Sequence, residues 1–368
     1  MQKILQINAG SKIFGGVESF IFNYYKNIEK KEFNFDFLTL GYSTYTHQAE
    51  YMKENGSELF ELDVDVTRIS GKILLIIRLF RFLKTHHYTI IHIHTGGKIT
   101  QIICLAIAKI LGVTHRIAHS HTFLEKEFCG RLKSKIICKL ATNYLACSSA
   151  SADYMFGSDN ADKVLVMHNA IELDKFVFNH ELRKQYKERF GIKNEYIIGN
   201  VARFQKVKNH KYMIDIITYL KDINVKLFLV GDGELKEEIK RYAEERGVIN
   251  QVQFLGQRQD VNCLYQIFDV FILPSLHEGF PFTLVEAQAS GLDIVVTKGI
   301  TEEVKIIDNV YFLPINDDGK LWADKIKMLI HSKEKRKSEY KKVSSYGYDI
   351  KHETNKLLSL YKGITGNS

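Results

Sequence analysis

Short apolar runs alternate with stretches of helical spacing along the whole chain. This alternation is typical of parallel α/β sheets, because each strand is followed by a helix that leads back to the start of the next strand. In the first half, strands are predicted at residues 3–8, 33–40, 58–63, 89–94, 114–119, 144–148 and 163–168. In the second half, they are predicted at residues 196–202, 225–230, 252–255, 270–273, 293–297 and 311–314. The pattern predicts an α/β protein with two parallel sheets.

A polar stretch at residues 169–189 separates the two series of strands and contains few strand-forming residues. A chain of 368 residues, of which 45% are hydrophobic, is long enough to build two cores. We therefore predict an N-terminal domain at residues 1–172 and a C-terminal domain at residues 173–345. The amphipathic tail at residues 346–368 is predicted to form a further helix.

Two glutamates follow the apolar strand at residues 270–273. Glu278 lies in the loop after this strand, and a helix is predicted to begin after Pro281 and to end before Gly291. Ligands of parallel α/β sheets gather at the carboxyl ends of the strands, where helix N-termini favour phosphate. Glu286 lies more than one turn inside the helix, so the two carboxylates are expected to contact different parts of one ligand. A nucleotide-sugar fits this arrangement, and two solvated glutamates are the alternative.

Two cations follow the strand at residues 196–202. Arg203 and Lys208 lie in the loop after it. A planar guanidinium and a mobile ammonium can hold a diphosphate and neutralise charge on a leaving group, as a bound metal does in other enzymes. An ordinary basic loop is the alternative. Together with the glutamates, the two cations favour a diphosphate site that requires no metal.

The second half contains the motifs RFQKVKN, LVGDGEL, FLGQRQDV and LPSLHEGFPFTLVEAQASG, in this order. Their combination resembles the retaining nucleotide-sugar glycosyltransferases of family 4. In the first half, GSKIFGGVESF resembles the glycine-rich first loop of that family, and RIAHSHTF resembles the segment that carries its donor-side histidine. The resemblance spans nearly the whole chain and is strongest to bacterial capsule and exopolysaccharide transferases. It implies the GT-B fold, in which two Rossmann-like parallel α/β/α domains face each other across a cleft.

The resemblance also implies roles for individual residues. Arg203 and Lys208 would grip the donor diphosphate, Glu286 would hold the ribose, and Glu278 would meet the transferred sugar. The N-terminal domain would bind the acceptor, the C-terminal domain would bind the donor, and the C-terminal helix would cross back to the N-terminal domain. The residues predicted to contact the nucleotide-sugar besides these cations and Glu278 are Gly15, Gly16, Gly231, Gly233, Arg258, Gly279, Phe280, Thr283, Leu284 and Glu286.

His119 is assigned to the sugar's far hydroxyl groups and completes the predicted catalytic set of Arg203, Lys208, Glu278 and His119. His121 competes for the same role, because alternation along a strand places both histidines on one face. A structural histidine is the alternative for either. The chain departs from the family at Ala170, where many members carry glycine, and this puts only the linker assignment in doubt.

The predicted function is transfer of a sugar, with retention, from a nucleoside diphosphate donor to a glycan on a polyprenyl diphosphate carrier. UDP is the expected nucleotide, and no metal or other cofactor is expected. Asp63 and Asp65 spell the DxD motif of metal-dependent transferases, but they lie in the other half of the chain. His92 and His94 lack a third ligand nearby in the sequence, so a zinc site is not expected. A UDP-sugar 2-epimerase of the same fold and a catalytically silent glycan-binding partner are the alternatives.

Positive charge is concentrated between Val66 and Lys139, where thirteen lysine and arginine residues and two glutamates give a net charge of +11 in a chain of net charge +8. Arg78, Arg81 and Lys84 lie on one predicted helix, and Arg131, Lys135 and Lys139 lie on another. We interpret this region as a surface that faces an anionic membrane, with a solvated basic face as the alternative. Nucleic acid is not an expected partner, because no recognition motif accompanies the charge.

The longest apolar stretches, such as residues 102–113, are shorter than the roughly 20 residues of a membrane-spanning helix. We therefore expect a cytoplasmic protein that is peripheral on the inner face of the plasma membrane. The five cysteines show no zinc-type spacing and are expected to be reduced thiols. Lys98, after the strand at residues 89–94, is a further expected acceptor contact.

Overall fold

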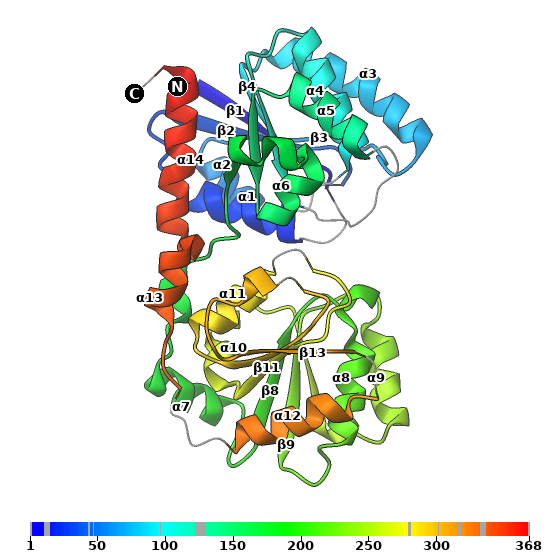
Figure 1. Ribbon diagram of the computed structural model, residues 1–368, viewed down its shortest axis with the longest axis vertical. Helices are drawn as coiled ribbons and strands as arrows, with labels where there is room; N and C mark the ends of the chain where they lie inside the picture. The colour runs from blue at the N-terminus through cyan, green and yellow to red at the C-terminus, as the bar shows by residue number, and fades with distance from the viewer. Residues whose placement is uncertain are drawn as a thin grey trace. The chain divides into compact units, whose positions relative to one another are not determined.

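The structure is a computed structural model that describes residues 2–10, 15–42, 45–46, 48–95, 97–121, 130–278, 281–300, 302–315, 318–331 and 336–366. Its contacts divide the chain into two compact units (Figure 1). Unit 1 comprises Met1–Ala170 and Ile350–Ser368, and unit 2 comprises Ile171–Asp349. The chain therefore leaves unit 1 at Ala170 and returns to it at Ile350.

Unit 1 contains a seven-stranded parallel sheet with the strand order β3-β2-β1-β4-β5-β6-β7. Each strand coincides with one of the apolar runs in the first half of the sequence. The strands are β1 (Gln2–Asn8), β2 (Phe33–Thr39), β3 (Leu59–Glu61), β4 (Ile90–Ile93), β5 (His115–Ser120), β6 (Asn143–Ala146) and β7 (Val164–Val166).

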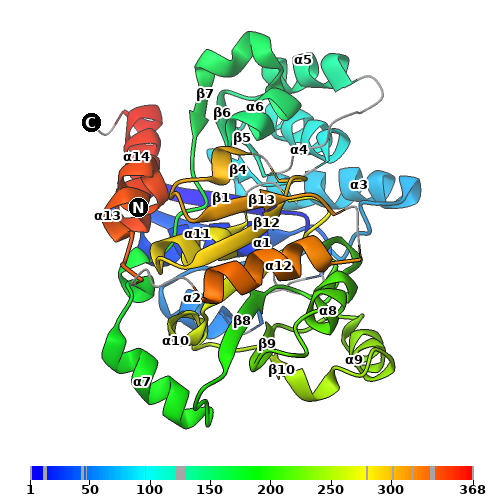
Figure 2. The same ribbon diagram turned by 60° about the horizontal axis from the view of Figure 1, so that its bottom comes forward.

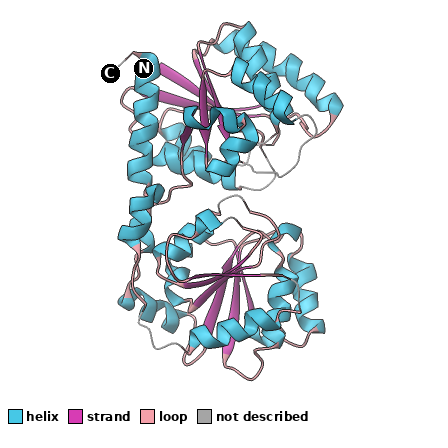
Figure 3. Cartoon of the chain, viewed as in Figure 1, coloured by secondary structure: helices cyan, strands magenta, loops and turns pink. Residues whose placement is uncertain are grey.

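Helices cover both faces of this sheet (Figure 3). One face packs against α3 (Ile69–His86), α4 (Lys98–Ile110), α5 (Gly130–Leu140) and α6 (Ser149–Phe156). The opposite face packs against α1 (Gly16–Asn27) and the last helix, α14 (Ile350–Thr365), which lie side by side. The short helix α2 (Ala49–Glu54) precedes β3. Because both faces are covered, most strand residues are buried, including polar ones such as Gln6, Asp36 and His119.

Unit 2 contains a six-stranded parallel sheet with the order β10-β9-β8-β11-β12-β13. The predicted strands of the second half are confirmed. The strands are β8 (Tyr196–Val201), β9 (Val225–Val230), β10 (Val252–Gly256), β11 (Val270–Leu273), β12 (Asp293–Thr297) and β13 (Val310–Leu313).

The helices of unit 2 also form two layers. The layer made by α8 (His210–Thr218), α9 (Lys236–Glu245) and α12 (Lys320–Ile330) packs on one face, and α8 and α9 lie next to each other (Figure 2). The layer made by α10 (Val261–Ile267), α11 (Phe282–Ala289) and α13 (Tyr340–Val343) packs on the other. The first helix of the unit, α7 (His180–Arg189), contacts α10.

Both sheets have the strand order of the doubly wound α/β fold, and the order reverses between two strands in each. In unit 1 the reversal lies between β1 and β4, and in unit 2 it lies between β8 and β11. Loops that leave the carboxyl ends of these two strands diverge to opposite faces, which opens a crevice for ligands. In the part of the chain that the structure describes, no helix is both long and apolar enough to span a membrane.

Candidate functional site

The loops after β8 and β11 flank the strand-order reversal of unit 2, and they carry the predicted cations and glutamates. Lys208 ends the short 3-10 helix at Lys206–Lys208, and its ammonium forms an ion pair with the Glu278 carboxylate. The two side chains are only 19% and 13% exposed. The structure therefore brings together two residues that lie seventy positions apart in the sequence.

Arg203 lies in the same loop, two residues beyond the end of β8. Its Nε atom is buried, and it has no hydrogen-bond partner among the residues that the structure describes. A buried guanidinium nitrogen without a partner is costly unless an acceptor arrives. Phosphate oxygens are suitable acceptors for an arginine fork.

The fold itself explains why residues 231 and 233, after β9, are glycines. Gly231 has φ +136, and a Cβ at this position would lie 2.1 Å from the carbonyl oxygen of Ala202. Gly233 has φ +156, and its Cβ would lie 2.7 Å from the carbonyl oxygen of Phe204. Both glycines are needed because the loop after β9 packs closely on the loop after β8. Their predicted contact with the nucleotide stays a prediction.

Glu286 lies in the second turn of α11, and the side chain of Tyr265 from α10 holds it. The Tyr265 hydroxyl group lies 2.8 Å from Glu286 Oε2 and 3.1 Å from the carbonyl oxygen of Thr283. Burial raises the pKa of Glu286 to about 7, and the hydrogen bond from Tyr265 partly opposes this shift. Sequence reasoning did not find Tyr265. The sequence gives one indication of Tyr265: it is a tyrosine on a helix between two core strands, and a buried tyrosine hydroxyl group needs a hydrogen-bond partner.

The other residues of unit 2 that were predicted to contact the nucleotide-sugar lie in different environments. Arg258 donates to both carboxylate oxygens of Asp260, at 2.8 and 2.6 Å, so one edge of its guanidinium is already occupied. The pKa of Asp260 is lowered mainly by this pairing. Leu284 is fully buried in the core, and its backbone N–H donates to the carbonyl oxygen of Pro281. Gly279 and Phe280 lie outside the described residues.

In unit 1, the predicted glycine-rich loop leads into α1. The backbone N–H of Gly15 donates to Glu18 Oε2 at 3.1 Å, which helps to cap the start of the helix. Gly16 is exposed, and a Cβ at this position would meet no atom of the described residues within 4 Å. Residues 11–14 of the same loop lie outside the described residues. The predicted contact of Gly15 and Gly16 with the donor stays a prediction.

The two competing histidines of β5 differ in accessibility. His119 is completely buried, whereas His121 follows the last residue of β5 and is partly exposed. Burial lowers the pKa of His121 to about 3 and that of His119 well below its usual value, so both rings are neutral at neutral pH. Exposure favours His121 over His119 for a direct ligand contact. The preference for His119 came from the motif, which does not show how deep each side chain lies.

Other chemistry-bearing residues of unit 1 have local partners. Asp65 Oδ1 accepts from the backbone N–H and the hydroxyl group of Thr67, at 3.0 and 2.5 Å, and Asp65 also pairs with Arg68. These contacts hold the turn before α3 and give the carboxylate of Asp65 a structural role. Lys98 is buried, with its ammonium 4.2 Å from the centroid of the Tyr154 ring. Its predicted acceptor contact stays a prediction.

Two doubly wound α/β domains, with paired cations and glutamates at a strand-order reversal, define a nucleotide-binding enzyme of the GT-B type. The family model for Glycosyltransferase Family 4 matches residues 14–175, and the model for Glycosyl transferases group 1 matches residues 183–346. The chain is 31% identical over 375 residues to the EpsF protein of Bacillus subtilis, with 98% of this chain and 96% of that protein covered. The chain belongs to glycosyltransferase family 4. It is a glycosyltransferase that acts on nucleotide sugars.

Further relatives agree with this assignment. The chain is 27% identical over 238 residues to the UDP-Gal:alpha-D-GlcNAc-diphosphoundecaprenol alpha-1,3-galactosyltransferase of Escherichia coli, covering 60% of this chain and 61% of that protein. Among solved structures, Anabaena HepE in complex with UDP matches with a TM-score of 0.76 at 17% identity, covering 99% of this chain and all of that chain. Sucrose-phosphate synthase from Thermosynechococcus elongatus matches with a TM-score of 0.75 at 15% identity, covering both chains fully. These structures confirm the GT-B fold.

Proposed function

We propose that this protein transfers a sugar from a UDP-linked donor, with retention of the anomeric configuration, to a glycan on a polyprenyl diphosphate carrier. UDP as the nucleotide is supported by the HepE structures, which were solved with UDP, UDP and glucose, and UDP-glucose. A carrier-linked acceptor is supported by the likeness to the Escherichia coli galactosyltransferase, whose acceptor is a diphosphoundecaprenol-linked sugar. A role in capsule or exopolysaccharide synthesis is supported by the likeness, over 102 residues, to the Vi polysaccharide biosynthesis protein VipC/TviE of Salmonella typhi.

The proposal rests on the ion pair between Lys208 and Glu278, together with the buried Nε of Arg203, which has no partner among the described residues. In the reaction, the bond between the sugar's anomeric carbon and the β-phosphate oxygen breaks, and the acceptor oxygen bonds to that carbon on the same face. Lys208 and Arg203 stabilise the negative charge on the departing diphosphate. The acceptor's proton passes to a phosphate oxygen of the leaving group. Glu278 holds Lys208 in place and faces the transferred sugar.

Glu286 is proposed to accept hydrogen bonds from the ribose hydroxyl groups, because Tyr265 holds its carboxylate on α11, whereas Glu278 lies in the loop before this helix. For the donor sugar, the exposure of the two histidines supports His121 as the contact from unit 1. His119 would then act through its neighbours. The two assignments differ in outcome, because replacing a contacting histidine lowers turnover with UDP-sugar while leaving the affinity for UDP unchanged.

Replacement of Lys208 tests the proposal. Lys208→Ala should lower kcat by about 10²-fold or more, which is the usual cost of removing one electrostatic stabiliser of a transition state. Lys206→Ala is the matched control, because Lys206 is an exposed lysine of the same short helix. Turnover of UDP-sugar on a polyprenyl-diphosphate-linked acceptor should persist in EDTA. A donor screen by thermal shift with UDP, GDP and ADP sugars identifies the nucleotide.

Two results would contradict the proposal. If activity depends fully on Mn²⁺, Asp63 and Asp65 become the candidate metal ligands. Lys208 and Arg203 are then not the groups that neutralise the leaving diphosphate. Release of free sugar without any acceptor would instead identify a UDP-sugar 2-epimerase, and UDP binding without turnover would identify a silent glycan-binding protein.

The proposed place of action is an anionic membrane surface, which unit 1 would contact through α3 and α5. Besides its basic residues, α3 exposes a row of large apolar side chains that we name the apolar ridge: Ile69, Ile73, Ile76, Ile77 and Phe80. Ile69 and Ile73 are 79% and 58% exposed. An exposed apolar row beside Arg81 and Lys84 fits the boundary between lipid headgroups and acyl chains.

A further inference from the structure

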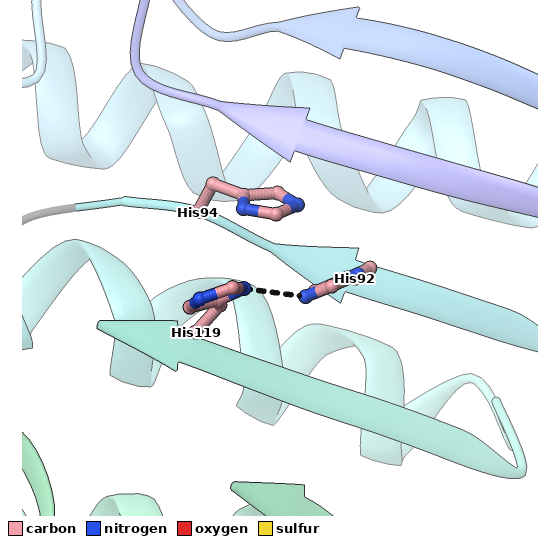
Figure 4. A group of neighbouring side chains, drawn as sticks. All are labelled: His92, His94 and His119. Carbon is pink, nitrogen blue, oxygen red and sulfur yellow. Dashed lines mark hydrogen bonds between the residues drawn. The ribbon is translucent and has the colours of Figure 1, made fainter. Parts of the chain in front are cut away.

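An otherwise apolar layer beneath α1 and α14 contains several histidine side chains. Alternation along β4 directs Ile91 and Ile93 toward α3–α6, so His92 and His94 point to the opposite face. His119 of β5 and His121, which directly follows this strand, add two more histidines to this face. Figure 4 shows His92, His94 and His119 pointing toward one another from β4 and β5. We name four residues the histidine cluster: His92, His94, His119 and His121.

The rings of the cluster are hydrogen-bonded in pairs across the two strands. His92 Nε2 lies 3.0 Å from His119 Nδ1, and His94 Nδ1 lies 2.8 Å from His121 Nε2. One ring nitrogen from each of His92, His94 and His119 lies within 4.8 Å of the others. Each pair holds two nitrogens and one hydrogen between them, and the lone pair of the acceptor nitrogen is engaged in that hydrogen bond. An ion that displaced the hydrogen would meet imidazole nitrogens, which are among the ligands of late transition metals.

The outer nitrogens of the β4 histidines already have the partners that a metal ligand needs. His92 Nδ1 lies 2.8 Å from the Tyr361 hydroxyl group, and His94 Nε2 lies 2.7 Å from Gln6 Oε1. Histidines that bind a metal through one ring nitrogen usually hold a hydrogen-bond partner at the other, which fixes the orientation of the ring. Gln6 and Tyr361 therefore orient His94 and His92 so that their inner nitrogens converge.

One further observation is a small space beside His92 and His94. A cavity of about 20 Å³ adjoins the cluster and is lined by His92, His94, Gln6 and Tyr361 among others. This volume is sufficient for one water molecule.

We propose that His92, His94 and His119 bind one divalent transition-metal ion of the zinc type, with a water molecule in the fourth position. The ion replaces the inner hydrogen bonds of both histidine pairs and joins β4 to β5 beneath α14. At a zinc–nitrogen distance of about 2.0–2.1 Å, tetrahedral ligand atoms lie about 3.3 Å apart, so the widest of the present separations must close by rotation of the rings. Imidazole ligands select Zn²⁺, Cu²⁺ or Ni²⁺ over Mg²⁺ and Ca²⁺.

The protonation state of the cluster suits this ligand set. Burial lowers the pKa of His92 to about 3, so its ring is neutral and offers a lone pair at any pH near neutrality. The ion brings two positive charges into an apolar layer. A water molecule bound to zinc ionises near pH 7, which removes one of these charges. The site lies in unit 1 and uses none of the donor contacts of unit 2, so the proposal does not rest on the proposed function.

Metal content of the full chain tests the proposal. The protein is stripped with a chelator, incubated with Zn²⁺ or Co²⁺, passed over a desalting column and analysed for bound metal. We expect about one equivalent per chain and, with Co²⁺, the visible absorption of a tetrahedral nitrogen site. At a hundredfold excess of free Zn²⁺ over Kd, Tm should rise by about 5 °C or more, whereas Mg²⁺ should have no effect.

Paired variants identify the ligands. His92→Gln combined with His94→Gln should lose the bound equivalent, whereas the control His86→Gln combined with His87→Asn should keep it, because these two histidines are exposed on unit 1. Asparagine tolerates the left-handed backbone of residue 87, where φ is 51. UDP affinity should be the same in both variants. Two results would overturn the proposal, whether or not the first variant folds. One is wild-type protein that retains less than about one tenth of an equivalent of metal, and the other is loss of the metal from the control variant.

Discussion

At the scale of single residues, Glu286 is the group whose charge state depends most on solution conditions. Its pKa is raised to about 7 by burial, so it is partly protonated near neutral pH. Ribose hydroxyl groups donate more strongly to the ionised carboxylate than to the neutral acid. The affinity for UDP should therefore increase as pH rises through about 7, and below that value it should fall by up to about tenfold per pH unit. Isothermal titration with UDP between pH about 5.5 and about 8.5 measures this.

Glu286→Gln is the control for this prediction, because UDP itself titrates in the same range. The variant should bind UDP more weakly at high pH than the wild type, and its affinity should vary less with pH. The same pKa shift has the opposite sign for folding. The native state keeps a proton that the unfolded state has released above about pH 4.5, so this contribution to stability declines as pH rises toward 7. Equal pH profiles for both proteins would contradict the role of Glu286.

The sequence predicted the important side chains of unit 2, but not how they contact one another. Arg203, Lys208, Glu278 and Glu286 could be found because each follows an apolar strand in a recognisable motif. Their partners could not, since the pairing of Lys208 with Glu278 depends on two loops that meet only after β8 and β11 become neighbours. Tyr265 lies in no motif, and its contact with Glu286 depends on the packing of α10 against α11.

At the scale of elements, α3 combines an apolar ridge with flanking cations. Replacing Ile73 and Ile77 by serine should reduce binding to anionic vesicles by at least about tenfold, because two exposed apolar side chains no longer enter the lipid. Leu321→Ser combined with Met328→Ser on α12 is the matched control, since these residues are also exposed apolar side chains of an amphipathic helix. Co-sedimentation with vesicles of stated anionic lipid content measures the binding.

The contributions of charge and of apolar contact to vesicle binding can be distinguished by varying the salt concentration. Reversing charge at Arg81, Lys84, Arg131 and Lys135 should weaken binding mostly at low ionic strength, because exposed charges are screened beyond about 8 Å at physiological salt. Arg78 is left unchanged, since its guanidinium donates to the carbonyl oxygens of Leu62 and Asp63 and holds the fold. Wild-type protein that never sediments with anionic vesicles would show that the ridge and the basic face have another role.

The strands were predictable from sequence because short apolar runs, most clearly Val225–Val230 and Val270–Leu273, alternate with stretches of helical spacing. The buried face of α3 was harder to predict. Leu75, Leu79 and Leu83 face the core, but the opposite side also carries isoleucines, so the pattern did not show which apolar residues are buried. The histidine cluster was missed for a different reason. Its members lie on neighbouring strands, and only the parallel register of β4 with β5 brings them together.

At the scale of the whole molecule, α14 belongs to unit 1 although it is last in the sequence, and Tyr361 is its main contact. The Tyr361 ring is fully buried, and its hydroxyl group accepts from Gln6 Nε2 at 3.1 Å. Nearby on the same helix, Glu353 accepts from the backbone N–H of His168, just before the chain leaves unit 1. The stability of unit 1 therefore depends on a segment that follows unit 2.

Tyr361→Ala should lower the stability of unit 1 by about 3–5 kcal/mol and leave unit 2 unchanged, because the cavity forms entirely within unit 1. The single tryptophan, Trp322, is buried in unit 2, so its fluorescence reports the unfolding of that unit alone, whereas circular dichroism reports both. In urea with EDTA present, the variant should show an earlier circular-dichroism transition and an unshifted fluorescence transition. Tyr42→Ala, an exposed tyrosine of unit 1, should shift neither. If both transitions of the Tyr361 variant move together, the two units unfold as one cooperative body.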